Sequence, residues 1–136
     1  MYSSWQGVSG PGSGRPFAPS ILEEYVEEYF EQVDQVPFME KVFDIKPEKH
    51  AVIPAVTHVN GTGRLQTVSR AVNPRYYDLI RTFYDKTGVP VLLNTSFNEN
   101  EPIVNTPEHA LECFLRTKMD ILVLENCVII RNGNEV

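Results

Sequence analysis

Small polar residues follow a wholly apolar run and are the residues best suited to bind a ligand. The stretch VLLNTSFNENEPIV at 91–104 passes from an apolar strand pattern into Asn94, Thr95, Ser96, Phe97 and Asn98. If extended backbone continues through Phe97, the side chains of Ser96 and Asn98 point to one side. A hydroxyl and an amide there can bond a phosphate oxygen or a carbonyl without adding charge. The same groups can instead satisfy the backbone of a tight turn, and spacing leaves both interpretations open.

Arg64 and His58 are the second pair of candidates, because they flank the turn sequence NGTG. Both could contact one anion through charge-assisted hydrogen bonds. The segment 58–81 holds four arginines and one aspartate, a local charge of +3 (4 - 1), so an anion can bind although the whole chain carries -6. The alternative for Arg64 is a solvated surface arginine.

His109 and Cys113 are four residues apart on a predicted helix, which raises a metal pair or a thiol nucleophile. Two ligands do not make a metal site, and Cys113 lies next to the apolar stripe of that helix. We therefore rank a cysteine-dependent enzyme last.

Composition sets the broad class. A chain of 136 residues with 42% hydrophobic content predicts one domain with one core. The charge of -6 argues against general nucleic-acid binding. Neither an apolar stretch of roughly 20 residues nor a leader pattern is seen, which predicts a cytoplasmic protein without membrane contact. Cys113 and Cys127 are expected to be reduced, buried thiols.

The elements that must position these residues are read from periodicity. Ser20 with Glu23 forms a capping box, predicting a helix over about 20–34. A strand is predicted near 39–45, and a β-rich run at 51–59 holds Pro54 at an edge or a bulge. The Asn60-Gly61 turn predicts a hairpin that leads into a strand at 64–69.

The second half of the chain has sharper boundaries. Asn73-Pro74 and Gly88 delimit a helix over 74–87, and Thr106-Pro107 begins a third helix. The apolar run VPVLL predicts a central strand, and two strands surround Glu125-Asn126. The class is therefore α/β, with α+β possible: a mixed twisted β-sheet and about three helices.

Several ordered blocks resemble one family. These are RPFAPS (15–20), PAVTHVNGTGRLQTV (54–68), NPRYYDLI (73–80), GVPVLLNTSFNENEPIV (88–104) and TPEHALECFLRTKMDILVL (106–124). They resemble the C-terminal region of the carbamoyltransferases typified by nodulation protein U and the antibiotic O-carbamoyltransferases. The likeness covers residues 15 to about 130.

The resemblance implies a fold, a reaction and partners. It implies a partial YrdC-like domain that uses ATP, with Mg²⁺ in the full-length enzyme, and carbamoyl phosphate to form a carbamoyl-adenylate. A Kae1-like N-terminal domain would then carry out O-carbamoylation of a small-molecule acceptor. Ser96-Phe97-Asn98 matches the Ser-x-Asn motif that contacts the nucleotide or its phosphates. Arg15 and Arg64 match family arginines that would neutralise phosphate charge.

Two departures from the family pattern shape the expectation for this chain. Asn60 stands where the family commonly has Asp, and SGPGSG replaces the basic approach to RPFAP. We therefore expect residues 1–14 to be a flexible tail or a segment left by cloning, and 15–136 to be an N-terminally truncated domain. Such a domain should bind ATP weakly or not at all, lack transfer activity, and expose an apolar face or sheet edge that invites self-association. The alternative is a noncatalytic α/β interaction module.

Overall fold

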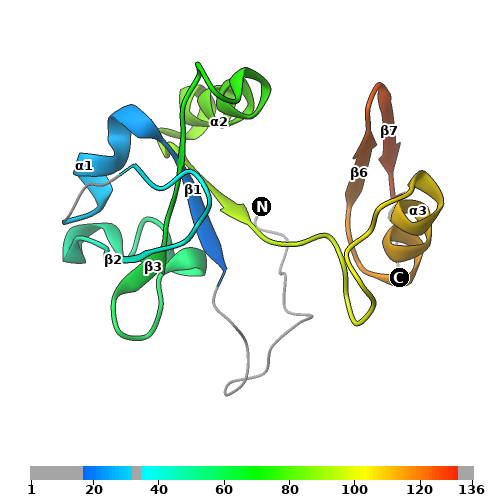
Figure 1. Cartoon of the computed structure of the whole chain (residues 1–136), viewed down its shortest axis with the longest axis horizontal. Helices are drawn as coiled ribbons and strands as arrows, with labels where there is room; N and C mark the ends of the chain where they lie inside the picture. Colours follow the sequence, from blue (N-terminus) through cyan, green and yellow to red (C-terminus); the bar gives the residue numbers. More distant parts are fainter. Residues whose placement is uncertain (1–16, 32–34, 132–136) are drawn as a thin grey trace. The chain divides into compact units, whose positions relative to one another are not determined.

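The computed structural model describes residues 17–31 and 35–131, which fall into two compact units with the chain divided between Thr95 and Ser96 (Figure 1). The sequence predicted one domain from residue 15 onward, and the structure divides that region more finely. The predicted tail at 1–14 and the candidate residue Arg15 lie outside the described residues.

The first unit is built on a three-stranded mixed sheet in the order β4-β1-β5. Strand β4 runs parallel to β1 and β5 runs antiparallel to it, while β2 and β3 form a separate antiparallel pair. The mixed strand directions agree with the predicted class. The elements are β1 (Ala18–Leu22), the 3₁₀ turn η1 (Glu23–Tyr25), α1 (Val26–Tyr29), β2 (Val42–Asp44), η2 (Pro47–Lys49), η3 (Pro54–Val56), β3 (Thr62–Arg64), β4 (Gln66–Val68), α2 (Pro74–Thr87) and β5 (Val91–Asn94).

The first helix, predicted over about 20–34, is realised only in part. Ser20 is not a helix cap but a fully buried residue in the middle of β1, with 0% exposure. Among residues 20–31, helical backbone is limited to η1 and the four-residue α1, and residues 32–34 of the predicted helix lie outside the described residues. The physical reason is that β1 is the central strand: it takes ladder hydrogen bonds from both sides, and that pairing outweighs the local capping signal.

The predicted hairpin and central strand were wrong. Pro54 begins a 3₁₀ turn instead of lying in a strand, a position where its missing N–H is harmless. Strand β3 pairs with the distant β2, with Phe43 opposite Gly63. Strand β5 lies at an edge of the sheet, and Leu93 is 38% exposed. Long-range pairing partners, which a turn signal cannot specify, account for both errors.

Helix α2 begins and ends where the sequence predicted. The side chain of Asn73 accepts a hydrogen bond from the backbone N–H of Tyr76, Pro74 occupies the first turn, and Gly88 terminates the helix at φ 73°. A left-handed residue after the last turn favours glycine. The helix lies against β1 and β5, with Ile80 fully buried.

The core of the first unit occupies both faces of the sheet. On one face Leu22 and Val68 pack with Ile80 of α2. On the other face Ile21 and Val91 join a larger cluster with Phe30 and residues from the loops and from β2. Alternate residues of β1 therefore serve opposite layers, as the period of an extended strand requires.

The second unit is an α-helix against a hairpin. Its elements are α3 (Pro107–Arg116), β6 (Ile121–Leu124) and β7 (Cys127–Ile130), as the sequence predicted, and α3 lies beside β6 (Figure 1). One hairpin face packs on Ala110 and Phe114 of α3. The other face is exposed: Ile121, Val123, Val128 and Ile130 are 55–65% accessible. The expected apolar face left by truncation and the expected self-association both stay predictions.

Two smaller observations complete the fold. Cys113 is buried as predicted, but Cys127 is exposed at the hairpin turn, because its side chain falls beyond the part of β7 that packs on α3. Both thiols are free. Within 17–31 and 35–131, none of the helices has the length and apolar character needed to cross a membrane.

Candidate anion-binding site

Ser96 and Asn98 contact one another, as their spacing predicted. The Ser96 hydroxyl donates to Oδ1 of Asn98 at 2.5 Å, and Nδ2 of Asn98 donates to the backbone carbonyl of Glu101 at 3.0 Å. Phe97 points elsewhere and packs against the core of the second unit, while its carbonyl accepts from Val104 N–H. The turn interpretation is therefore realised in part, because both side chains already have partners inside the loop.

Glu101 and Arg116 support this loop, and the sequence gave no reason to select them. Arg116 of α3 forms ion pairs with Glu99 at 3.0 Å and with Glu101 at 2.5 Å. The pKa of Glu101 falls to about 2, chiefly because its own backbone N–H donates to the carboxylate. The Cys113 thiol, the Asn100 N–H and the charge of Arg116 lower the pKa further, while desolvation opposes them.

Acid should therefore loosen the loop that holds Ser96 and Asn98. A carboxyl whose pKa is depressed on folding stabilises the folded state above its unfolded pKa near 4.5, and this contribution disappears as the pH falls toward about 2. We expect Glu101→Gln to remove this part of the acid dependence in the second unit. The measurement is an acid titration of α3 amide signals, with Glu125→Gln in the β6–β7 turn as the charge-matched control. Unchanged acid sensitivity in Glu101→Gln would contradict the assignment.

Asn94 belongs to a different cluster from Ser96. Its Nδ2 donates to Oε1 of Gln66 at 2.7 Å, and the buried Ser20 hydroxyl donates to the same oxygen at 2.6 Å. Gln66 in turn donates to the carbonyl of Pro37. This cluster ties the three strands of the sheet together at one end. Thr95, the next candidate, is exposed.

His58 and Arg64 lie on either side of a tight turn, as predicted. The backbone N–H of His58 donates to the Thr62 carbonyl at 2.8 Å, and the N–H of Gly61 donates to the His58 carbonyl at 2.9 Å. Gly61 adopts φ 82°, and a Cβ there would lie 3.0 Å from the His50 ring, so glycine is required twice over. Strand β3 begins directly after Gly61 and ends at Arg64.

Two buried polar atoms of this turn have no hydrogen-bond partner within the described ranges: Nε2 of His58 and Nε of Arg64. Buried polar groups are nearly always bonded, so two exceptions at one turn make this turn a candidate ligand contact. Burial lowers the pKa of His58, and the charge of Arg64 lowers it further. The lowered pKa favours the neutral imidazole, so within this turn it is Arg64 that can offer an anion a charge-assisted bond.

The His109 and Cys113 pair is not assembled as a reactive site. His109 bonds Asn105 through Nδ1 at 3.1 Å, on the exposed side of α3. Burial raises the pKa of the Cys113 thiol, and the Glu101 carboxylate raises it further. A reactive cysteine needs the opposite shift. Across the part of the chain that the structure describes, no three metal-ligating side chains of the His, Cys, Asp or Glu type cluster.

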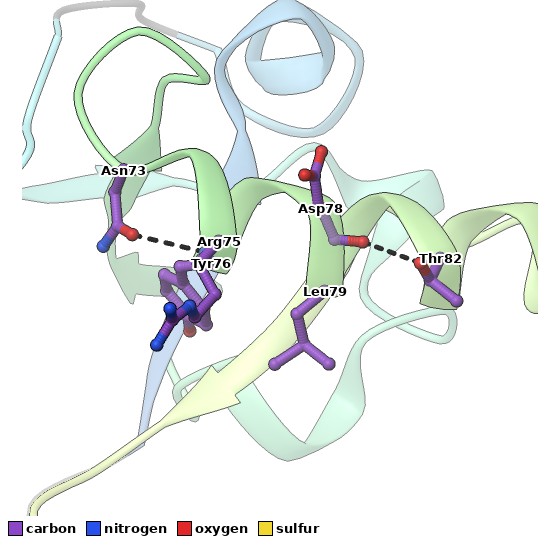
Figure 2. A pocket seen from close by; sticks show the side chains of 6 residues that line it. All are labelled: Asn73, Arg75, Tyr76, Asp78, Leu79 and Thr82. Atoms are coloured by element: carbon purple, nitrogen blue, oxygen red, sulfur yellow. Dashed lines mark hydrogen bonds between the residues drawn. The ribbon is translucent and has the colours of Figure 1, made fainter. Parts of the chain in front are cut away.

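A hollow of about 540 Å³ runs along α2, where Figure 2 shows its lining side chains. The polar groups of this hollow are largely used within the helix: Asn73 accepts from Tyr76 N–H, and Thr82 donates to the Asp78 carbonyl. None of the predicted site residues lines it. We therefore keep two separate candidate places, each within its own unit: the His58–Arg64 turn and the Ser96–Asn98 loop.

Comparison with known proteins bears on what these two places bind. A family model described as carbamoyltransferase C-terminus matches residues 11–131 of this chain. The chain belongs to the carbamoyltransferase C-terminal family. The match covers the turn with His58 and Arg64, the Ser96–Asn98 loop and α3 together. The resemblance on which the sequence prediction rested is thus confirmed.

Several curated proteins are similar in sequence to this chain. It is 53% identical over 116 residues to nodulation protein NolO of Bradyrhizobium diazoefficiens, which covers 82% of this chain and 21% of that protein. It is 34% identical over 111 residues to the 3'-hydroxymethylcephem-O-carbamoyltransferase of Amycolatopsis lactamdurans, covering 80% and 21%. Nodulation protein U of Rhizobium tropici matches at 38% over 84 residues. The chain spans about a fifth of the length of NolO and of the cephem O-carbamoyltransferase.

Proposed function

We propose that this chain forms part of the site at which a longer carbamoyltransferase binds ATP and carbamoyl phosphate. In the longer enzyme, water would release phosphate from carbamoyl phosphate, and the carbamate left would attack the α-phosphate of ATP to give a carbamoyl-adenylate and pyrophosphate. A hydroxyl of a small-molecule acceptor would then take the carbamoyl group and release AMP. The observation that carries the proposal is the buried Nε–H of Arg64, which has no partner among the described residues. The O-carbamoyltransferase relative supports the same class of reaction.

Arg64 is suited to a phosphate for electrostatic reasons. A guanidinium stays charged and presents several N–H donors in a fixed plane that matches phosphate oxygens. A buried donor without a partner carries a desolvation cost that a ligand oxygen removes on binding. The lowered pKa of the neighbouring His58 favours its neutral form, so the fixed positive charge of this turn is that of Arg64.

The Ser96–Asn98 loop would contribute neutral donors. Asn98 uses one N–H on the Glu101 carbonyl and its oxygen on Ser96, which leaves its second N–H for a ligand. The Ser96 hydroxyl donates its hydrogen to Oδ1 of Asn98, so Ser96 orients the Asn98 amide and does not itself donate to a ligand. Asn98 would thus donate to the anion, and Ser96 would hold the Asn98 amide in place.

The proposal also includes Mg²⁺ and a Kae1-like domain of the longer protein. The described residues gather no ligand cluster of their own for a cation. We propose that Mg²⁺ arrives on the nucleotide phosphates, which commonly supply several of its oxygens. A Kae1-like domain of the longer protein would supply acceptor recognition.

The test is a titration of this chain with ATP and with carbamoyl phosphate, followed by heteronuclear NMR. We expect weak, saturable shifts at residues 58–64 and 94–98, and no turnover. Ser96→Ala should lower the affinity a few-fold, because Asn98 loses the bond that orients it. Thr95→Ala, at the exposed neighbour, is the matched control. A well-folded spectrum without any shifts would reject the proposal for this chain and favour the interaction module.

A further inference from the structure

The orientation of the Asn60 side chain is fixed by two donors. The backbone N–H of Thr62 points at Oδ1 of Asn60 at 3.3 Å, and the Thr62 hydroxyl points at the same atom at 2.8 Å. A backbone N–H can only donate, so the atom that it meets must be the amide oxygen. The carboxylate that the family commonly has at this position would accept in the same way.

The proton on the His58 ring follows from this geometry. Because Thr62 gives its only hydroxyl hydrogen to Asn60, its oxygen must act as an acceptor toward Nδ1 of His58, 2.9 Å away. Nδ1 therefore carries the hydrogen in the neutral imidazole. Nε2 is then a lone-pair acceptor, and it is the atom that is buried without a partner in the described residues.

The turn thus holds one buried acceptor and one buried donor that have no partner among the described residues. Nε2 of His58 can accept a hydrogen bond, and Nε–H of Arg64 can donate one. The dianion of acetyl phosphate offers only acceptors to these atoms. A ligand that carries an N–H next to a carbonyl or phosphate oxygen satisfies both of them, and the carbamoyl group has that pattern.

We propose that Nε2 of His58 accepts a hydrogen bond from the carbamoyl amino group, while Arg64 donates to an oxygen of the same molecule. This inference rests on the proposed function and assigns His58 as the residue that selects carbamoyl phosphate over acyl phosphates of the same shape. Acetyl phosphate differs from carbamoyl phosphate by a methyl group in place of the amino group. With it, Nε2 would stay buried and unbonded, which is the arrangement that rejects analogues most effectively.

The first measurement needs no ligand. NMR of the imidazole nitrogens in the free chain should show the proton of His58 on Nδ1, and the proton of His50 on Nε2, since the latter faces the Ile45 carbonyl at 2.8 Å. His50 is therefore an internal control of the opposite kind. Asn60→Asp should keep the His58 proton on Nδ1, whereas Asn60→Ala should give a mixture. A proton on Nε2 of His58 in the unaltered chain would overturn the inference and leave the proposed function standing.

The second measurement is a comparison of carbamoyl phosphate and acetyl phosphate as ligands. We expect the unaltered chain to bind carbamoyl phosphate roughly tenfold more tightly, the effect of about one hydrogen bond left unmade. His58→Phe should bring this ratio near unity, and His58→Gln, with an oxygen near the position of Nε2, should restore part of it. Equal affinities in the unaltered chain, or equal losses for both ligands in His58→Phe, would refute the role of His58 alone. Binding of neither ligand would refute the proposed function as well.

Discussion

Replacing Arg64 with methionine is expected to lower the affinity for carbamoyl phosphate by roughly 10- to 100-fold, the value of a charge-assisted hydrogen bond. The same change should leave the free energy of unfolding unchanged or raise it by up to about 1 kcal/mol, because the removed Nε–H is buried and has no partner in the described residues. Loss of binding without loss of stability is characteristic of a residue kept for a ligand. Titration by NMR and urea unfolding measure the two quantities.

Arg75→Met is the matched control for Arg64→Met. It removes the same charge from the same unit, and Arg75 lines the hollow along α2 instead of the turn (Figure 2). We expect it to change the affinity for carbamoyl phosphate by less than about twofold, as screening of an exposed charge implies. If Arg75→Met weakened binding and Arg64→Met did not, the anion would lie at α2 and our choice of site would be wrong.

Truncating Phe30 is expected to cost the first unit about 3–5 kcal/mol of its free energy of unfolding. Phe30 is 1% exposed, packs in the larger core cluster and forms a β-bridge with Ile45. Phe30→Ala would leave a cavity between α1 and the β2 region that this close-packed core cannot fill. The measurement is denaturant unfolding followed through amide signals of residues 17–31 and 35–95.

Phe38→Ala provides the control for the loss of an aromatic ring. Phe38 is 81% exposed in the same unit, so its removal should change the free energy of unfolding by no more than about 0.5 kcal/mol. Similar losses in the two variants would show that the stability of this unit does not depend on the cluster around Phe30.

Local signals in the sequence were sufficient for some elements and misleading for others. Helix α2 was predicted from Asn73, Pro74 and Gly88, because caps and a left-handed terminator act within a few residues of chain. Ser20 carried an equally clear cap signal, yet it lies in the central strand. The difference is that β1 is held extended by pairing with two strands distant in sequence. The ends of α2, in contrast, are set by residues close to them in sequence.

For the candidate site, the sequence by itself determined which residues to consider: Ser96, Asn98 and Arg64 were chosen from residue type, turn chemistry and family blocks. The spacing of two residues also predicted the contact between Ser96 and Asn98. Gln66, Glu101 and Arg116 were missed, although Gln66 stood within a block that matched the family. Their partners lie up to 46 residues away, which no periodicity encodes.

The sequence alone thus determined the family, the mixed α/β class, two of the three helices and the polar residues available to a ligand. Only the tertiary structure decided that β1 is central, that burial lowers the pKa of His58, and that Nε2 of His58 and Nε of Arg64 are buried without a partner among the described residues. The physical reason is that burial and hydrogen-bond direction depend on which distant groups meet. A residue's type fixes what it can donate or accept, and its surroundings fix which of those groups remain for a ligand.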